Sequence, residues 1–257
     1  MLRLSTLTLA LSCTLFLAAQ ENNPLINSSE WIQKGIELHE QGKYKEAISS
    51  YSRIDRSDTN YYRALYEMAY SLSADSQITK AVELCVAGLK KPNSYWPQLY
   101  TLYGNLLDDA GQPEKALRIY DTAIALYPAF TSLRLNKGTT YLILKKYAEA
   151  EVVLKECILI NPYESSAHYK LGLTAIAQGK IIEAFLSYLN YMLLQPTGKF
   201  QQPCITQMSN ICKSTDNIQE LINTRNNDGE MPFALLEKII LSKIALDKNY
   251  KPLIKLD

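Results

Sequence analysis

The chain has 257 residues, of which 47% are apolar and 21% are charged, an ordinary balance for a globular protein. Lys plus Arg number 27 and Asp plus Glu number 26, so the formal charge of +1 gives no reason to expect a nucleic acid or an anionic membrane as partner. Glycine and proline, at 10 residues each, are too few for a collagen-like, linker-rich or disordered chain.

The N-terminus has the three parts of a secretory signal. A basic residue, Arg3, precedes an apolar run over 4–19, which ends in two alanines and is followed by polar residues. We expect 1–19 to be removed as a signal peptide, 20–27 to form a linker, and the mature chain to be periplasmic or secreted. An uncleaved anchor and a lipid anchor through Cys13 remain alternatives. No later stretch is long and apolar enough to cross a bilayer, so we expect no membrane span after signal removal.

The rest of the chain repeats itself with a nearly constant period. Two series of small residues recur at steps of 34, 35, 34 and 34 residues. The first series is Gly35, Ala69, Gly104, Gly138 and Gly172, and the second is Ala47, Ala81, Ala116, Ala150 and Ala184. A third series runs in phase with them and reads Tyr51, Cys85, Tyr120, Leu154 and Tyr188. Five units in register are typical of a repeat protein.

The period and the residue types resemble the tetratricopeptide repeat. The third unit carries the pattern most fully, in the residues Tyr100, Tyr103, Gly104, Leu107, Gly111, Ala116, Tyr120, Ala123 and Pro128. The resemblance implies an all-α fold, a right-handed α-solenoid of about five helix pairs followed by C-terminal capping helices. The repeat array then covers 28–198, in the units 28–61, 62–95, 97–130, 131–164 and 165–198.

Each unit is expected to form two helices, helix A and helix B. The expected helices cover 29–41, 44–56, 62–74, 78–90, 98–109, 113–126, 130–144, 147–159, 165–177 and 181–194. Small residues in the middle of helix A allow its helix B to approach closely, and the glycines at 42, 111 and 179 are placed to end helix A in a left-handed conformation.

The period is lost after residue 198. We predict helices over 199–213, 217–224 and 232–246, and we assign 199–257 as a capping segment that hides the open end of the array. The apolar helix over 232–246 has no obvious place in the array, so it packs on something else or the natural architecture extends further.

The four cysteines beyond the signal are expected to be free. Cys85 and Cys157 fall on packed helix B positions, where cysteine acts as a small hydrophobe. Cys204 and Cys212 would lie about 12 Å apart along one helix, too far to form a disulfide.

No catalytic or metal-binding motif is present in the sequence. We find no phosphate-binding glycine loop, no nucleophile elbow, no His-Glu-x-x-His and no Cys-x-x-Cys. His39 and His168 are interpreted as structural, and Asp108 with Asp109 as a solvated face. We therefore predict that the chain is not an enzyme and needs no cofactor or metal.

The resemblance further implies a concave groove, lined mainly by helix A, in which a peptide binds. The positions that it assigns to peptide contacts are Tyr66, Tyr70, Asn105, Asn136, Tyr169 and Lys170. Asn105, Asn136 and Lys170 match part of a pattern that captures a C-terminal carboxylate in some relatives, but Thr101 and Ser166 stand where two lysines would be. Charge-based capture is therefore expected to be weak, and plain polar lining is the alternative. Tyr66 and Tyr70 either hold an apolar side chain or pack between units.

The sequence thus favours a non-enzymatic scaffold that binds a protein or peptide of unknown identity in the periplasm or outside the cell. The alternative is a structural spacer, or a module of an envelope assembly that self-associates through the end faces of the array.

Overall fold

The structure, a computed structural model, describes residues 27–213 and Glu220. The predicted signal peptide and the predicted helices over 217–224 and 232–246 therefore lie outside the described residues, apart from Glu220. Every regular element in the described part of the chain is a helix, which confirms the all-α class. None of these helices has the length and hydropathy needed to cross a membrane.

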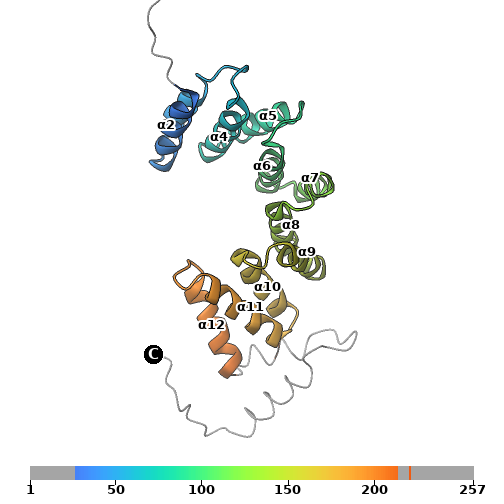
Figure 1. Cartoon of the computed structure of the whole chain (residues 1–257). Coiled ribbons are helices and arrows are strands. Elements are labelled where there is room, and N and C mark those ends of the chain that lie inside the picture. The colour runs from blue at the N-terminus through green and yellow to red at the C-terminus, as the bar shows by residue number, and fades with distance from the viewer. Residues whose placement is uncertain (1–26, 214–219, 221–257) are drawn as a thin grey trace, which may run out of the picture. The chain divides into compact units, whose positions relative to one another are not determined.

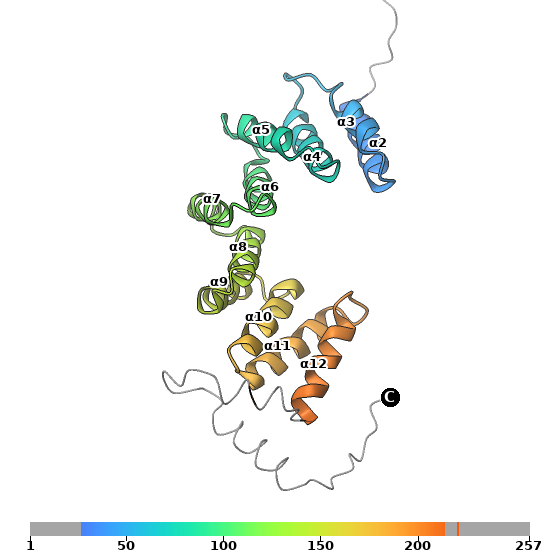
Figure 2. The same cartoon turned by 180° about the vertical axis from the view of Figure 1, so that it is seen from behind.

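The chain forms two compact units, and the first extends to Leu84. Its described helices, from residue 27 on, are α2 (Ser28–Glu40), α3 (Tyr44–Tyr51), α4 (Tyr61–Ala74) and the first part of α5 (Ile78–Gly88). Helix α2 packs on α3, and both contact α4; Figure 1 labels α2 and α4, and Figure 2 labels α3 beside α2. Ile32, Ala47 and Tyr51 form the centre of this core, and each is at most 1% exposed.

The second unit begins at Cys85, and its described part up to residue 213 contains three complete helical hairpins followed by one further helix. The hairpins are α6 (Trp96–Asp109) with α7 (Pro113–Leu126), α8 (Thr131–Ile143) with α9 (Tyr147–Ile160), and α10 (Ser165–Ala177) with α11 (Ile181–Leu194). The further helix, α12 (Gln201–Lys213), packs on α11, as Figure 2 also shows. Each helix A contacts the helix A of the next hairpin, α6 with α8 and α8 with α10, which is the stacking that defines an α-solenoid.

The small residues of helix A let a large side chain of helix B pass beneath them. A Cβ atom added at Gly104 would lie 2.5 Å from Cζ of Tyr120, and one added at Gly172 would lie 2.6 Å from Cδ1 of Tyr188. Both tyrosines are fully buried. The recurring glycine is therefore required by close approach of a neighbouring ring, as the sequence pattern indicated.

The turns between helix A and helix B are left-handed. Gly42, Gly111 and Gly179 have φ of +75°, +70° and +70°. Ser76 and Lys145 occupy the equivalent turns with φ of +61° and +57°, a conformation that strains residues with a Cβ atom. The backbone geometry of the repeat is thus kept at two turns where the sequence does not supply glycine.

One predicted helix was too long. We predicted a helix over 44–56, but α3 ends at Tyr51, whereas the other described helices match their predicted bounds to within two residues. The carboxylate of Asp55 accepts hydrogen bonds from the backbone N–H of Ser57 at 2.8 Å and from its hydroxyl at 2.6 Å. This local turn competes with the helix for the backbone, so the last helical turn is replaced by a loop.

The described cysteines have no disulfide partner, as predicted. Cys85 and Cys157 are fully buried, and burial raises the pKa of the Cys157 thiol to about 11. Cys204 is buried in the core that α12 shares with α10 and α11, whereas Cys212 is exposed.

Candidate functional site

The helix A layer of the second unit holds most of the predicted peptide contacts. Asn105 lies on α6, Asn136 on α8, and Tyr169 and Lys170 on α10. Because these three helices pack in succession, the four side chains belong to one layer. Tyr66 and Tyr70 lie on α4 of the first unit.

A hydrogen bond from a buried tyrosine fixes the orientation of the Asn105 side chain. The hydroxyl of Tyr120 donates a hydrogen bond of 2.6 Å to Oδ1 of Asn105, so the amide NH2 group of Asn105 keeps its two donors for another acceptor. Burial, with a smaller contribution from Asp108, raises the pKa of Tyr120 and keeps its hydroxyl protonated as this donor. The glycine at 104 makes the arrangement possible because it lets the ring reach across the helix.

A polar bond between neighbouring A helices recurs in both units. Thr140 on α8 donates to a carboxylate oxygen of Asp108 on α6 at 2.7 Å. In the first unit, Nδ1 of His39 on α2 lies 2.8 Å from the hydroxyl of Ser71 on α4. In both pairs the residues are 32 apart in the sequence. Asp108 thus ties two helices together, and was not simply the solvated residue that we predicted.

Lys170 has a half-buried amine and no ion pair within the described part of the chain. Burial lowers the pKa of Lys170, and the nearby charge of Lys199 lowers it further. The side-chain amide of Asn136, on the neighbouring helix, likewise has no hydrogen-bond partner among these residues. Sequence reasoning missed Lys199 because it lies in the loop after α11, outside the helix A positions to which the family pattern applies.

Tyr169 belongs to an aromatic cluster. Its ring stacks on Phe200 with 4.0 Å between the ring centroids and 3° between the planes. Tyr191 lies 5.6 Å from it, centroid to centroid. One face of Tyr169 is thus covered by the residue just before α12, and its contact with a peptide stays a prediction.

In the first unit the two predicted tyrosines form a stack with His39. Tyr66 and Tyr70 have parallel rings 6.4 Å apart, and His39 stacks on Tyr70 at 4.9 Å. Tyr70 packs between α2 and α4 in this way, yet 48% of it stays exposed. The stack with His39 is packing between repeat units, and the binding of an apolar side chain by this pair stays a prediction.

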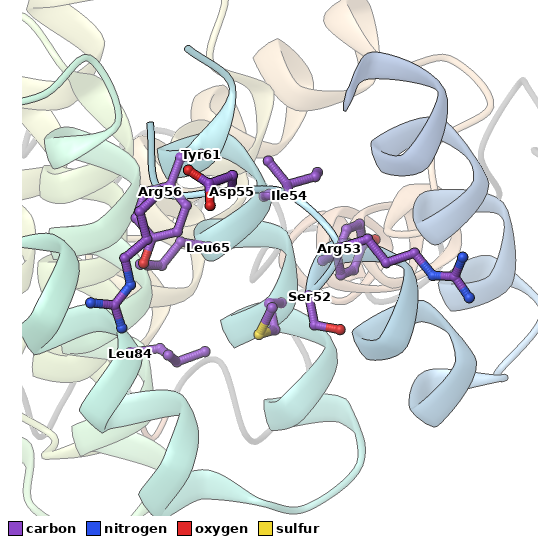
Figure 3. Close-up of a pocket in the computed structure, with 11 residues that line it drawn as sticks. Ser52, Arg53, Ile54, Asp55, Arg56, Tyr61, Leu65 and Leu84 are labelled. Atoms are coloured by element: carbon purple, nitrogen blue, oxygen red, sulfur yellow. The ribbon is translucent and has the colours of Figure 1, made fainter. Parts of the chain in front are cut away.

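The early end of α3 leaves an open pocket of about 460 Å³ within the first unit (Figure 3). Leu65, Met68 and Leu84 contribute apolar lining. Arg53 and Arg56 extend to opposite sides, and the Arg53 guanidinium lies 4.2 Å from the centroid of the Trp31 ring. The pocket thus combines an apolar lining with the charged side chains of Arg53, Asp55 and Arg56.

The histidines and acidic residues form no metal site in the part of the chain that the structure describes. Nε2 of buried His168 lies 2.8 Å from the carbonyl oxygen of Pro162, which confirms the structural role predicted for this residue.

Comparison with known proteins agrees with this geometry. Residues 103–157, which cover α7 and α8, half of α6 and most of α9, match the sequence profile of the tetratricopeptide repeat. A thermophilic tetratricopeptide-repeat protein of Thermus thermophilus is similar in structure, with a TM-score of 0.60 at 17% identity over 71% of this chain and 100% of the other. MamA of Desulfovibrio magneticus, from its residue 41 to its end, is similar with a TM-score of 0.52 at 19% identity over 67% of this chain and 97% of that one.

Stacked helical hairpins with a 34-residue period define an α-solenoid. The similar structures show that this chain has the fold of tetratricopeptide-repeat proteins, and residues 103–157 match the profile of that repeat.

Proposed function

We propose that this protein is a non-enzymatic scaffold that binds an extended peptide segment bearing a carboxylate, over the helix A layer formed by α6, α8 and α10. The observation that carries the proposal is Lys170, a half-buried cation for which the described residues supply no counter-charge. A buried charge without a partner is unfavourable, so a ligand that brings an anion to it gains a strong, charge-assisted hydrogen bond.

The neighbouring groups suit the rest of such a peptide. The amides of Asn105 and Asn136 have donors to offer to peptide carbonyl groups, and Tyr120 fixes the orientation of the first of them. Lys199 adds a second positive charge near Lys170. Two cations at one end of the layer favour a C-terminal carboxylate or an acidic side chain there, although two of the lysines expected from the family pattern are absent.

The experiment compares two peptide pools on the immobilised protein. The pools are random decapeptides with free C-terminal carboxylates and the same decapeptides amidated. We expect the free-acid pool to be retained preferentially. We also expect Lys170→Met to reduce its retention at least about tenfold, the equivalent of one charged hydrogen bond.

The matched control is Lys115→Met, which removes an exposed lysine from α7 on the opposite layer of the hairpin. It should retain the free-acid pool as the unmodified protein does. Equal retention of the two pools, or equal losses in the two variants, would contradict the proposal.

The proposed location is the periplasm or the outside of the cell, and support comes from the signal-like sequence of 1–19. N-terminal sequencing of the protein from its native source should begin at Gln20. A start at Met1 would refute export by signal cleavage, and a blocked, lipid-modified Cys13 would favour the anchored form instead.

A further inference from the structure

The pocket of the first unit lies where other repeats pack an apolar side chain of helix B. Residues of the first and third repeats correspond when they lie 69 residues apart, as Ala47 and Ala116 do. By this count Asp55 takes a position that is apolar in the four later repeats, where it is Leu89, Ile124, Ile158 and Met192. The last three of these side chains pack on buried core clusters. The first repeat therefore lacks one packed apolar side chain.

The walls of the pocket support this correspondence. Tyr51, Tyr61 and Ala64 line the pocket, and their counterparts 69 residues later belong to the core cluster on which Ile124 packs. These counterparts are Tyr120, Phe130 and Leu133. The pocket is thus the place that a helix B side chain fills in the second unit.

Two substitutions leave this place open in the first unit. Asp55 lies in the loop after α3, and its carboxylate accepts hydrogen bonds from the backbone N–H and the hydroxyl of Ser57. Ala64 of α4 stands where α8 has Leu133, a fully buried side chain, so this wall is cut back as well. The larger Ile54, at the position of an alanine in the third repeat, takes up part of the space, and about 460 Å³ stays open.

The wall formed by α4 is more apolar than the repeat requires. Met68 lines the pocket at the position where α8 has Lys137, whose amine pairs with the carboxylate of Asp121 on α7. Ser52, also in the lining, stands at the position of Asp121. An ion pair of the second unit is thus replaced in the first unit by a thioether beside a hydroxyl, which favours an apolar occupant.

The rim of the pocket carries positive charge. Arg53 and Arg56 line it, and neither forms an ion pair with another residue that the structure describes. The Arg53 guanidinium is held against the Trp31 ring, and Arg56 extends on the other side of the pocket (Figure 3). Asp55 is the one acidic residue in the lining, and its carboxylate is engaged by Ser57. The Arg56 guanidinium is therefore available to an anion.

A ligand for this pocket needs an apolar body and one anionic end. The volume lies near the lower end of the range for small-molecule sites, about 300–1,000 Å³, and so suits a single alkyl chain. An apolar chain that displaces water from these walls gains the burial that the missing side chain would have supplied. A carboxylate at the rim gains charge-assisted hydrogen bonds from a guanidinium, whose fork matches its two oxygens.

We propose that the pocket of the first unit binds a small amphiphilic carboxylate, with its alkyl chain against Leu65, Met68 and Leu84 and its carboxylate at Arg56. The proposal goes beyond the proposed function and does not depend on it, because every residue that lines the pocket belongs to the first unit and the peptide layer belongs to the second.

The test follows the methyl group of Met68 in the full chain, labelled with ¹³C-methyl methionine. Decanoate is the probe, added below its micelle concentration, and the spectrum of Met68→Leu assigns the signal. We expect a saturable shift of the Met68 signal and unchanged signals from Met192 and Met208, which lie on α11 and α12. Absence of a saturable shift at Met68, as when another part of the chain covers the pocket, would overturn the proposal. Equal shifts of the three signals would overturn it as well.

Two variants separate the apolar part of the site from the ionic part. Ala64→Leu introduces the residue that α8 has at the equivalent position and should abolish the decanoate shift by filling the pocket. Arg56→Met leaves the pocket open and should raise the dissociation constant of decanoate at least about fivefold, the loss of a charged contact. Arg118→Met, which removes an exposed arginine from α7, is the matched control and should leave the constant unchanged.

A probe of opposite charge tests the preference for an anion. Decyltrimethylammonium has the same alkyl chain and should bind to the unmodified protein at least about fivefold more weakly than decanoate. Equal binding of the two probes, undiminished decanoate binding by Ala64→Leu, or equal losses in Arg56→Met and Arg118→Met would each overturn the proposal.

Discussion

Replacing Gly104 by alanine tests how the repeat is packed, because two effects of opposite sign compete at this position. In an exposed helix, alanine is more stable than glycine by about 0.5–1 kcal/mol. Here the new Cβ atom would lie 2.5 Å from Cζ of Tyr120, well inside the roughly 3.5–4 Å of a favourable carbon contact. The ring therefore has to move by about 1 Å.

Tyr120 has little freedom to make that movement. Its side chain is fully buried, and its hydroxyl is bonded to Asn105 at 2.6 Å. Overpacking of this kind destabilises by about 1–3 kcal/mol, and weakening the hydrogen bond adds about 0.5–1.5 kcal/mol. After subtraction of the helix preference, we expect Gly104→Ala to lower the free energy of unfolding by about 2 kcal/mol.

The assay is urea denaturation followed by circular dichroism at the helix band, with the midpoint as readout. The double variant with Tyr120→Cys provides the control, since the second unit of the sequence pairs Ala69 with Cys85 at the equivalent positions. We expect the two substitutions together to cost at least about 1 kcal/mol less than the sum of their separate effects. A Gly104→Ala variant as stable as the unmodified protein, or more stable, would refute the packing argument.

Three further predictions concern other parts of the second unit. Lys145→Gly should stabilise the chain by about 1 kcal/mol because Lys145 has φ of +57°, whereas Gly111→Ala, at φ of +70°, should destabilise it by a similar amount. Thermal melts of both variants measure the two changes in stability. Changes in the same direction would contradict the strain argument. Burial alone would raise the pKa of Glu151, but hydrogen bonds from Lys155 and Lys180 outweigh burial, so the pKa is lowered. The Glu151 carboxylate therefore stabilises the fold at pH values above its unfolded pKa of about 4.3. This stabilisation is lost as the pH falls through the pKa of the folded state. Glu151→Gln should therefore be less stable than the unmodified protein at pH 7 by up to about 1 kcal/mol and equal to it near pH 2, and a difference that persists in acid would exclude this account. Lys170→Met should raise the melting temperature at pH 7, because it removes a cation that burial disfavours, while it lowers peptide retention; a variant less stable than the unmodified protein would instead assign Lys170 a structural role.

The sequence predicted the hairpins well because the residues that determine how the helices pack recur in each repeat. A glycine such as Gly104 recurs at a fixed distance before a tyrosine such as Tyr120, because the tyrosine ring packs against the helix at the glycine. A glycine recurs at the turns, at 42, 111 and 179, because the turn needs a positive φ. The end of α3 was missed because it is set by a local hydrogen bond from Ser57 to Asp55, which no periodic pattern reports.

The candidate site could be predicted only in part. The positions of Asn105 and Lys170 follow from the repeat, because each falls at a fixed offset on its helix A. Their surroundings do not, since the effect of the Lys199 charge on Lys170 and the stacking of Phe200 on Tyr169 depend on the course of the loop after α11, where the period is already lost.

The central claim is that a partner peptide lies on the helix A layer of the second unit. A photo-crosslinking residue tests it most directly, with p-benzoylphenylalanine in place of Leu173, an exposed side chain on α10. The control carries the same residue in place of Leu126, an exposed leucine at the end of α7. We predict that a retained free-acid peptide becomes attached at position 173 and that Lys170→Met abolishes the product. Attachment at position 126 alone, or at both positions with equal yield, would contradict the account.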